Sequence, residues 1–164
     1  MASFALAPMT TDMRVMTGVA LALPAIFVGS AVVTPFLVAG VLYGSAAFMI
    51  LLYAMVWFGF RPTAFAVTAD TLRIVWPART RGIARSEIVG VRSLTATEFR
   101  AEFGFGMRVG VGGLWGGFGL LHTSSKTFSM WVSRTDTFVI VTLKNDRPLL
   151  LTPETPAAFV QSLS

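Results

Sequence analysis

The chain has 164 residues and a net charge of +5, and its mean hydropathy is +0.71 with only 13% charged residues. This composition indicates a membrane protein with one small extramembrane domain, because the remaining length is too short for two such domains. The chain contains no cysteine, which excludes disulfides and thiolate chemistry.

Residues 1–14 are short and show no hydrophobic period, so we expect a cytoplasmic segment that is disordered or lies at the membrane interface. Residues 15–60 then contain no charged residue and no histidine. A membrane span needs roughly 20 apolar residues, so this run predicts two spans, over 15–33 and 36–60. The turn is expected at Thr34-Pro35, because a residue before proline avoids the helical region. The competing interpretation is a cleaved signal peptide, but the apolar run is too long and no cleavage site follows a short apolar core.

The basic residues near the span ends predict the orientation. Arg14 precedes the first span, Arg61, Arg73 and Arg79 follow the second, and the turn contains none. Basic residues favour the cytoplasmic side. We therefore expect a multi-pass protein of the cell (inner) membrane with both termini in the cytoplasm.

Small residues recur along one face of each predicted span. Such spacing lets helix backbones approach closely. We expect these faces to pack against each other within the pair, and the alternative is that they dock onto the helices of a partner. The residues are Gly18, Ala22, Ala25 and Gly29 in the first span, and Gly40 and Gly44 in the second.

Residues 61–164 change to an alternating pattern that is typical of β-strands. We expect about seven short antiparallel strands, over 64–68, 71–76, 81–84, 91–97, 127–133, 137–144 and 148–151. Thr152-Pro153-Glu154 has the composition of a helix start, with a threonine N-cap, a proline and an acid in the first turn. The pattern predicts a small barrel or sandwich with one end closed by a C-terminal helix.

Three stretches of this region resemble the bacterial pleckstrin-homology-like domains that follow a two-helix membrane anchor. They are FAVTADTLRIVW with RTRGIARSEIVGV, EFRAEFGFGMRVGVGGLWGGFGLL, and TFVIVTLKNDRPLLLTPETPAAFVQSL, which is the most specific. The resemblance covers roughly residues 62–163. It implies a partly open antiparallel barrel capped by the C-terminal helix, and a role as an adaptor for proteins or membranes without catalysis. The phosphoinositide pocket of the eukaryotic relatives has no residue-by-residue counterpart here.

Residues 103–119 combine many glycines with aromatic side chains. A phosphate-binding loop would also need a fixed lysine, a hydroxyl and a following helix, and these are missing. One interpretation is a long hairpin or an irregular loop. The other is that apolar residues interleaved with Arg108 dip into the headgroup region beside the anchor. These residues are Phe103, Phe105, Met107, Leu114, Trp115 and Phe118.

A basic cluster is predicted near the membrane from Arg73, Arg79, Arg81, Arg85 and Arg92. Each basic group near anionic lipid contributes about 1 kcal/mol, and the alternative is a solvated face. Nucleic acid is not expected, because no aromatic stacking platform accompanies the arginines.

Catalytic candidates are few. His122 is the only histidine, and Glu98 with Glu102 is the only close pair of carboxylates, in a stretch without a firm helical pattern. We therefore expect no enzyme, no metal site and no cofactor. The expected function is a membrane-anchored adaptor with a protein partner or a second copy, and with anionic lipid as a further candidate. The alternative is an accessory subunit of a larger membrane complex that docks through the helices.

Overall fold

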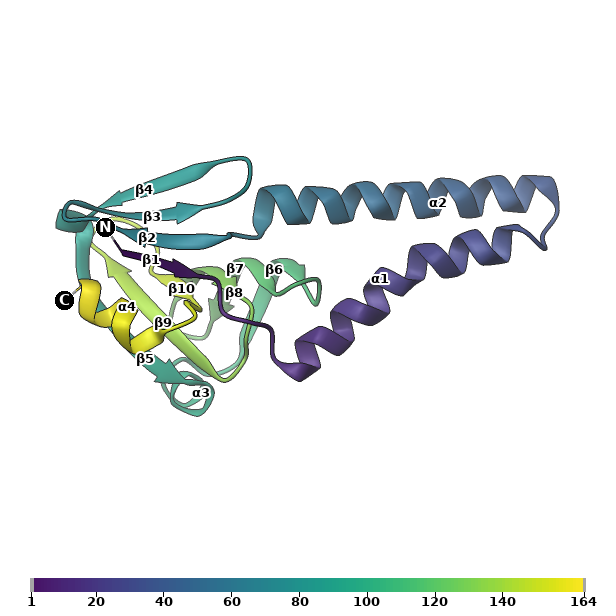
Figure 1. The fold of residues 1–164 in the computed structure, drawn as a ribbon. Coiled ribbons are helices and arrows are strands. Elements are labelled where there is room, and N and C mark those ends of the chain that lie inside the picture. The colour runs from purple at the N-terminus through teal and green to yellow at the C-terminus, as the bar shows by residue number, and fades with distance from the viewer. Residues whose placement is uncertain (1, 164) are drawn as a thin grey trace.

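A computed structural model describes residues 2–163. Two long helices project together from one side of a β-rich domain (Figure 1). Helix α1 spans Thr11–Ala31 and α2 spans Phe36–Met55, and α2 continues into a π-helical turn over Val56–Phe60. Both helical segments are long and apolar enough to span a membrane, and only 17% and 6% of their most apolar windows are buried. The break between them falls at the predicted turn, with Pro35 as the N-cap of α2.

The first sheet contains four antiparallel strands in the order β1-β2-β3-β4. The strands are β1 (Ala2–Ala5), β2 (Ala64–Val67), β3 (Thr71–Val75) and β4 (Thr80–Ala84). Strand β1 corrects the expectation of a disordered or interfacial N-terminus. It pairs with β2, and Phe4 packs edge-on against Phe159 with 5.3 Å between the ring centroids. This contact with the core holds a segment whose sequence shows little strand pattern. Because β1 precedes α1 and β2 follows α2, both ends of the helical hairpin return to the same side.

The second sheet contains six strands in the order β5-β9-β10-β8-β7-β6. Its short strand β10 pairs parallel with β8 and antiparallel with β9, which departs from the expected all-antiparallel pattern. The strands are β5 (Ile88–Thr95), β6 (Gly106–Gly112), β7 (Gly117–Thr123), β8 (Thr127–Val132), β9 (Thr137–Leu143) and β10 (Leu149–Leu151).

The main core lies between the two sheets. Alternation in the strands sends Phe65 and Ile74 from the first sheet, and Val139 and Leu151 from the second, into one buried cluster. Helix α4 (Pro156–Leu163) adds Phe159 to this cluster. The result confirms a mainly β domain with a C-terminal helix. Within residues 2–163, however, ten strands form two open sheets and no closed barrel.

A second cluster covers the opposite face of the six-stranded sheet. Helix α3 (Ala96–Phe103) places Phe99 and Phe103 against Phe128 and Ile140. This helix was not expected. It begins with a capping box in which Thr95 accepts from the Glu98 amide and the Glu98 side chain accepts from the Thr95 amide. These reciprocal bonds satisfy free amides of the first turn.

The C-terminal helix begins later than its sequence suggests. Instead of starting at Thr152-Pro153, the chain there remains extended, and Pro153 bridges to Leu6. Thr152 is buried and accepts a hydrogen bond from the Ser133 amide at 2.9 Å. The helix begins at Pro156, because backbone groups of the preceding residues form hydrogen bonds with the N-terminal segment.

Candidate interaction surface at the base of the helical hairpin

The glycine-rich segment is a β-hairpin whose tip contacts the helical hairpin. Strands β6 and β7 pair in register from Gly106 with Thr123 to Gly112 with Gly117. At the tip, the Thr17 hydroxyl of α1 donates to the Gly113 carbonyl at 3.1 Å and accepts from the Trp115 amide at 3.0 Å. Thr17 is only 4% exposed. A polar residue inside an apolar helix therefore satisfies the backbone of a turn that is 96 residues distant in sequence.

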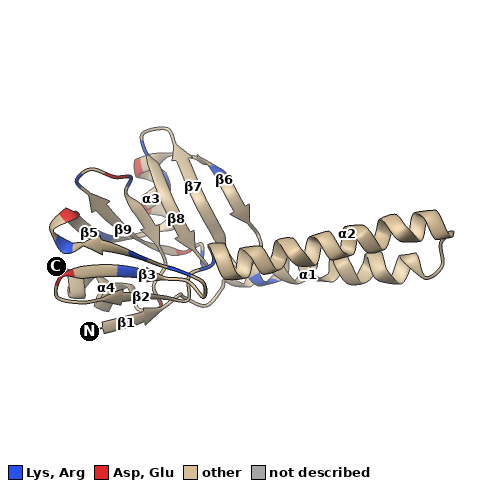
Figure 2. Ribbon diagram, turned by 90° about the horizontal axis from the view of Figure 1, so that it is seen from above, with Lys and Arg blue, Asp and Glu red and all other residues tan. Residues whose placement is uncertain are grey.

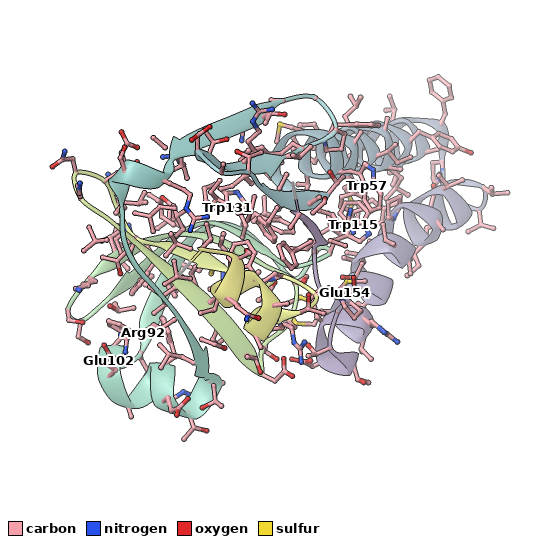
Figure 3. The ribbon with its side chains drawn as sticks, turned by 60° about the vertical axis from the view of Figure 1, so that its left-hand side comes forward. Trp57, Arg92, Glu102, Trp115, Trp131 and Glu154 are labelled. Carbon is pink, nitrogen blue, oxygen red and sulfur yellow. The ribbon has the colours of Figure 1, made fainter. Side chains whose placement is uncertain are left out.

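Aromatic side chains close the same junction. The Trp115 ring packs edge-on against Trp57 at 4.9 Å and against Tyr53 at 6.5 Å, and Figure 3 shows Trp57 and Trp115 side by side at the helix base. The Arg61 guanidinium lies over the Trp57 ring at 4.4 Å, a cation–π contact. Burial lowers the pKa of Arg61.

Tyr53 also supplies a hydrogen bond that Pro24 removes from α1. Pro24 has no amide hydrogen, so the carbonyl of Ala20, four residues earlier, lacks its helical donor. The Tyr53 hydroxyl donates to this carbonyl at 2.6 Å. Neighbouring side chains are expected to satisfy freed carbonyls in membrane helices, and here the neighbour lies on α2.

The predicted contact of the glycine-rich tip with lipid does not fit the burial of its residues. Leu114 is 6% exposed and Phe118 is fully buried, while Trp115 is half-buried against Trp57. The glycines have a structural reason. A Cβ at Gly110 would lie 2.3 Å from the Phe118 carbonyl oxygen, and Gly110 has φ of 137°. The close approach of β6 to β7 and the positive φ both require glycine there.

The predicted arginines do not form one cluster, as the spread of blue in Figure 2 indicates. Only Arg79 lies at the helix base, where it donates to the Gly59 carbonyl and covers Trp76. Arg73 is an exposed position of β3, opposite Gly82. The others have separate partners elsewhere: Arg81 pairs with Asp146, Arg85 donates to the Ser162 carbonyl, and Arg92 pairs with Glu102.

The small residues of the two helices do not pack against each other. A Cβ added at Gly18, Gly29, Gly40 or Gly44 would meet no atom within 4 Å, and Ala22 and Ala25 are exposed. The buried and half-buried positions of α1 instead follow Thr17, Ala20, Pro24, Phe27 and Ala31. The expectation of packing within the hairpin is therefore wrong, because this neighbouring stripe meets α2.

The catalytic candidates have structural partners. His122 Nδ1 lies 2.9 Å from the Thr127 hydroxyl. Hydrogen bonds from Thr95 lower the pKa of Glu98, and the bond from Arg92 lowers that of Glu102, so both carboxylates stay ionised at neutral pH. Figure 3 places Arg92 and Glu102 at α3, away from the helical hairpin. Among residues 2–163, no three His, Asp or Glu side chains gather as a metal site.

Sequence reasoning missed Thr17, whose signal was a hydroxyl in an apolar helix. It named Phe105 and Met107 among the apolar residues of the glycine-rich stretch, but it missed Val109, which completes an exposed apolar row just before and along β6. The alternation of these residues with Gly106, Arg108 and Gly110 was a usable signal for an edge strand.

Comparison with known proteins gives no match: no family model, curated protein or solved structure matches this chain. The function is therefore inferred from the residues and their geometry.

Proposed function

We propose that the chain is a membrane-anchored, non-enzymatic adaptor. In this proposal, α1 and α2 span the cell membrane with both ends cytoplasmic, and a pleckstrin-homology-like domain is held at the membrane face to bind a protein or the lipid surface. The main support for this proposal is the exposure of apolar side chains on the helices, with Phe36 89% and Leu37 82% exposed. Exposing so much apolar surface to water is unfavourable, whereas a bilayer accommodates it.

The junction supports a fixed presentation of the domain. Thr17, Trp115 and Trp57 link the β6–β7 tip to both helices, so the domain is not on a flexible tether. Trp57 and Tyr53 lie near the end of the long helix, where amphipathic rings favour the membrane–water interface. Arg61 and Arg79 lie at the same level, which agrees with a cytoplasmic base.

The topology is testable because the chain has no cysteine. Val33→Cys lies in the helical turn and Ser125→Cys in the β7–β8 turn. In intact cells, a membrane-impermeant maleimide should label the first and leave the second protected until permeabilisation. Equal labelling of both positions, or release of the chain by alkaline carbonate, would contradict the proposal.

A second candidate is an accessory subunit that docks through its helices. It is favoured by the open face at Gly18, Gly29, Gly40 and Gly44, since small residues allow close helix contact in membranes. Mass measurement of the detergent-purified protein separates the two functions. A stable complex that Gly29→Leu and Gly40→Leu dissolve, while Val33→Leu preserves it, would favour the subunit. A monomer in which all three variants behave alike would favour the adaptor.

A further inference from the structure

Strand β6 carries a row of exposed apolar side chains at the edge of the six-stranded sheet. Phe105 immediately precedes the strand and is 82% exposed, Met107 is 69% exposed and Val109 is 50% exposed. β6 pairs only with β7, so its outer edge has no partner strand within the described residues. Soluble proteins usually protect such edges with charge, proline or a covering element. An apolar edge therefore needs an explanation.

The position of β6 is fixed by the helix base. Its C-terminal end leads into the tip that Thr17 and Trp57 hold. In Figure 1 and Figure 2, β6 lies along the side of the domain from which the helices project, and it is the outermost strand of its sheet. The edge is therefore directed to the region where a membrane surface would surround α1 and α2.

The tip that follows β6 contacts α1. A Cβ at Gly113 would lie 3.3 Å from the Met16 Cε, and Met16 is itself 58% exposed. Gly113 is buried and Val111 is half-buried against the core, so exposed apolar residues lie on both sides of this packed junction: Met16 on the helix, and Val109 with Met107 on the strand. A membrane that surrounds Met16 would therefore lie close to the strand.

A cation accompanies this edge. Arg108 is exposed, and a Cβ at Gly112 would lie 2.8 Å from its Nη1. The guanidinium therefore extends toward the tip and the helix base. Within the described residues, no ion pair involves Arg108. Because successive side chains of a strand point to opposite faces, Arg108 projects from the face opposite Met107 and Val109. An edge with apolar residues on one face and a cation on the other suits the headgroup zone.

We propose that the β6 edge, through Met107 and Val109, lies in the headgroup zone of the bilayer and forms a second membrane contact of the domain. This inference rests on the proposed function, since it requires that the helices span the membrane. It narrows the expectation for residues 103–119: Leu114 and Phe118 at the tip are buried, and the flank of the hairpin, with Met107 and Val109, contacts lipid. The occupant is lipid and not a second chain, because β6 leads into the tip that contacts α1 and lies on the side of the domain from which the helices project.

The test uses the full-length protein in vesicles of phosphatidylcholine and phosphatidylglycerol. Single-cysteine variants Met107→Cys and Val109→Cys carry an environment-sensitive fluorophore. Spin-labelled lipids quench it from the headgroup, from the upper acyl chain or from the deep part of the acyl chain. Val89→Cys is the matched control, because Val89 is 62% exposed on β5, at the opposite edge of the same sheet. Val41→Cys on α2 reports whether the helices span the bilayer.

We expect several-fold stronger quenching by headgroup and upper-chain labels at positions 107 and 109 than at 89, and deep quenching at 41. Deep quenching at 41 with 107 and 109 no different from 89 would overturn this inference and leave the proposed function standing. Loss of quenching at 41 would overturn both. Oxidative cross-linking of Met107→Cys into dimers, without lipid quenching, would assign the edge to a second copy and refute the lipid contact.

Discussion

Replacing Thr17 by valine tests whether the domain is fixed to the helices. Valine keeps the shape of threonine but removes the hydroxyl that bonds both the Gly113 carbonyl and the Trp115 amide. Each buried group left without a partner costs about 1–3 kcal/mol. Two such groups would weaken docking of the tip by about 2 kcal/mol even if water recovers much of the loss. That value corresponds to a roughly 30-fold increase in the open population.

Amide hydrogen exchange followed by mass spectrometry measures this change directly, on the full chain in lipid nanodiscs. We expect peptides covering residues 112–118 to exchange roughly 30-fold faster in Thr17→Val, with little change in β9 or β10, which lie in the core. Thr17→Ser retains the hydroxyl and should restore protection. Thr34→Val is the matched control, because the Thr34 hydroxyl donates to the Ala31 carbonyl near the helical turn, far from the β6–β7 tip. Unchanged exchange at 112–118 in Thr17→Val would refute the reasoning.

Two further predictions concern single interactions. Tyr53→Phe leaves the Ala20 carbonyl without its donor, so thermal unfolding in detergent should show a loss of about 1–2 kcal/mol in the free energy of unfolding. Tyr43→Phe is the control and should have no effect. Equal behaviour of the two variants would contradict the role of Tyr53 as the donor that replaces the missing amide of Pro24. Arg134 lowers the pKa of Asp136 to about 2, below the usual value of an unfolded chain. This pair therefore stabilises the fold fully above about pH 4, and the contribution is lost as pH falls through about 2. Asp136→Asn should destabilise by less than about 1 kcal/mol at pH 7, because the pair is solvent-exposed, and by nothing near about pH 1. A difference that persists near about pH 1 would show another cause.

The junction has a consequence for how an adaptor of this kind would work. The N-terminal strand, the two helices and the β6–β7 tip meet on one side of the domain (Figure 1). The orientation of the domain relative to the helical hairpin is set by these contacts. In the proposed adaptor, a partner would bind elsewhere on the domain. One such place is an open hollow lined by Lys126, Lys144, Asp146 and Arg147, at the end of the β7–β8 turn and away from the docked tip.

Several features of the fold could be predicted from the sequence, because they depend only on residues that are neighbours along the chain. The uncharged run from 15 to 60 predicted the two helices and their turn at Pro35, which the structure confirms. Alternation predicted most of the strands in the domain. The capping box at Thr95 and Glu98 is also a local signal, and helix α3 was predictable from it. Phe99 and Phe103, four residues apart, mark its buried face.

The tertiary structure decided which of several equivalent faces is used. The small-residue stripe and the stripe through Thr17 and Pro24 both repeat at helical spacing, and only the position of α2 and the β6–β7 tip selects the second. The same holds for β1, whose four residues carry little pattern and become a strand because β2 offers an edge and Phe159 offers a hydrophobic contact. Local sequence determines the period of a segment, but long-range packing determines its partner. The helical hairpin could therefore be predicted from the chain alone, whereas its fixed attachment to the domain could not.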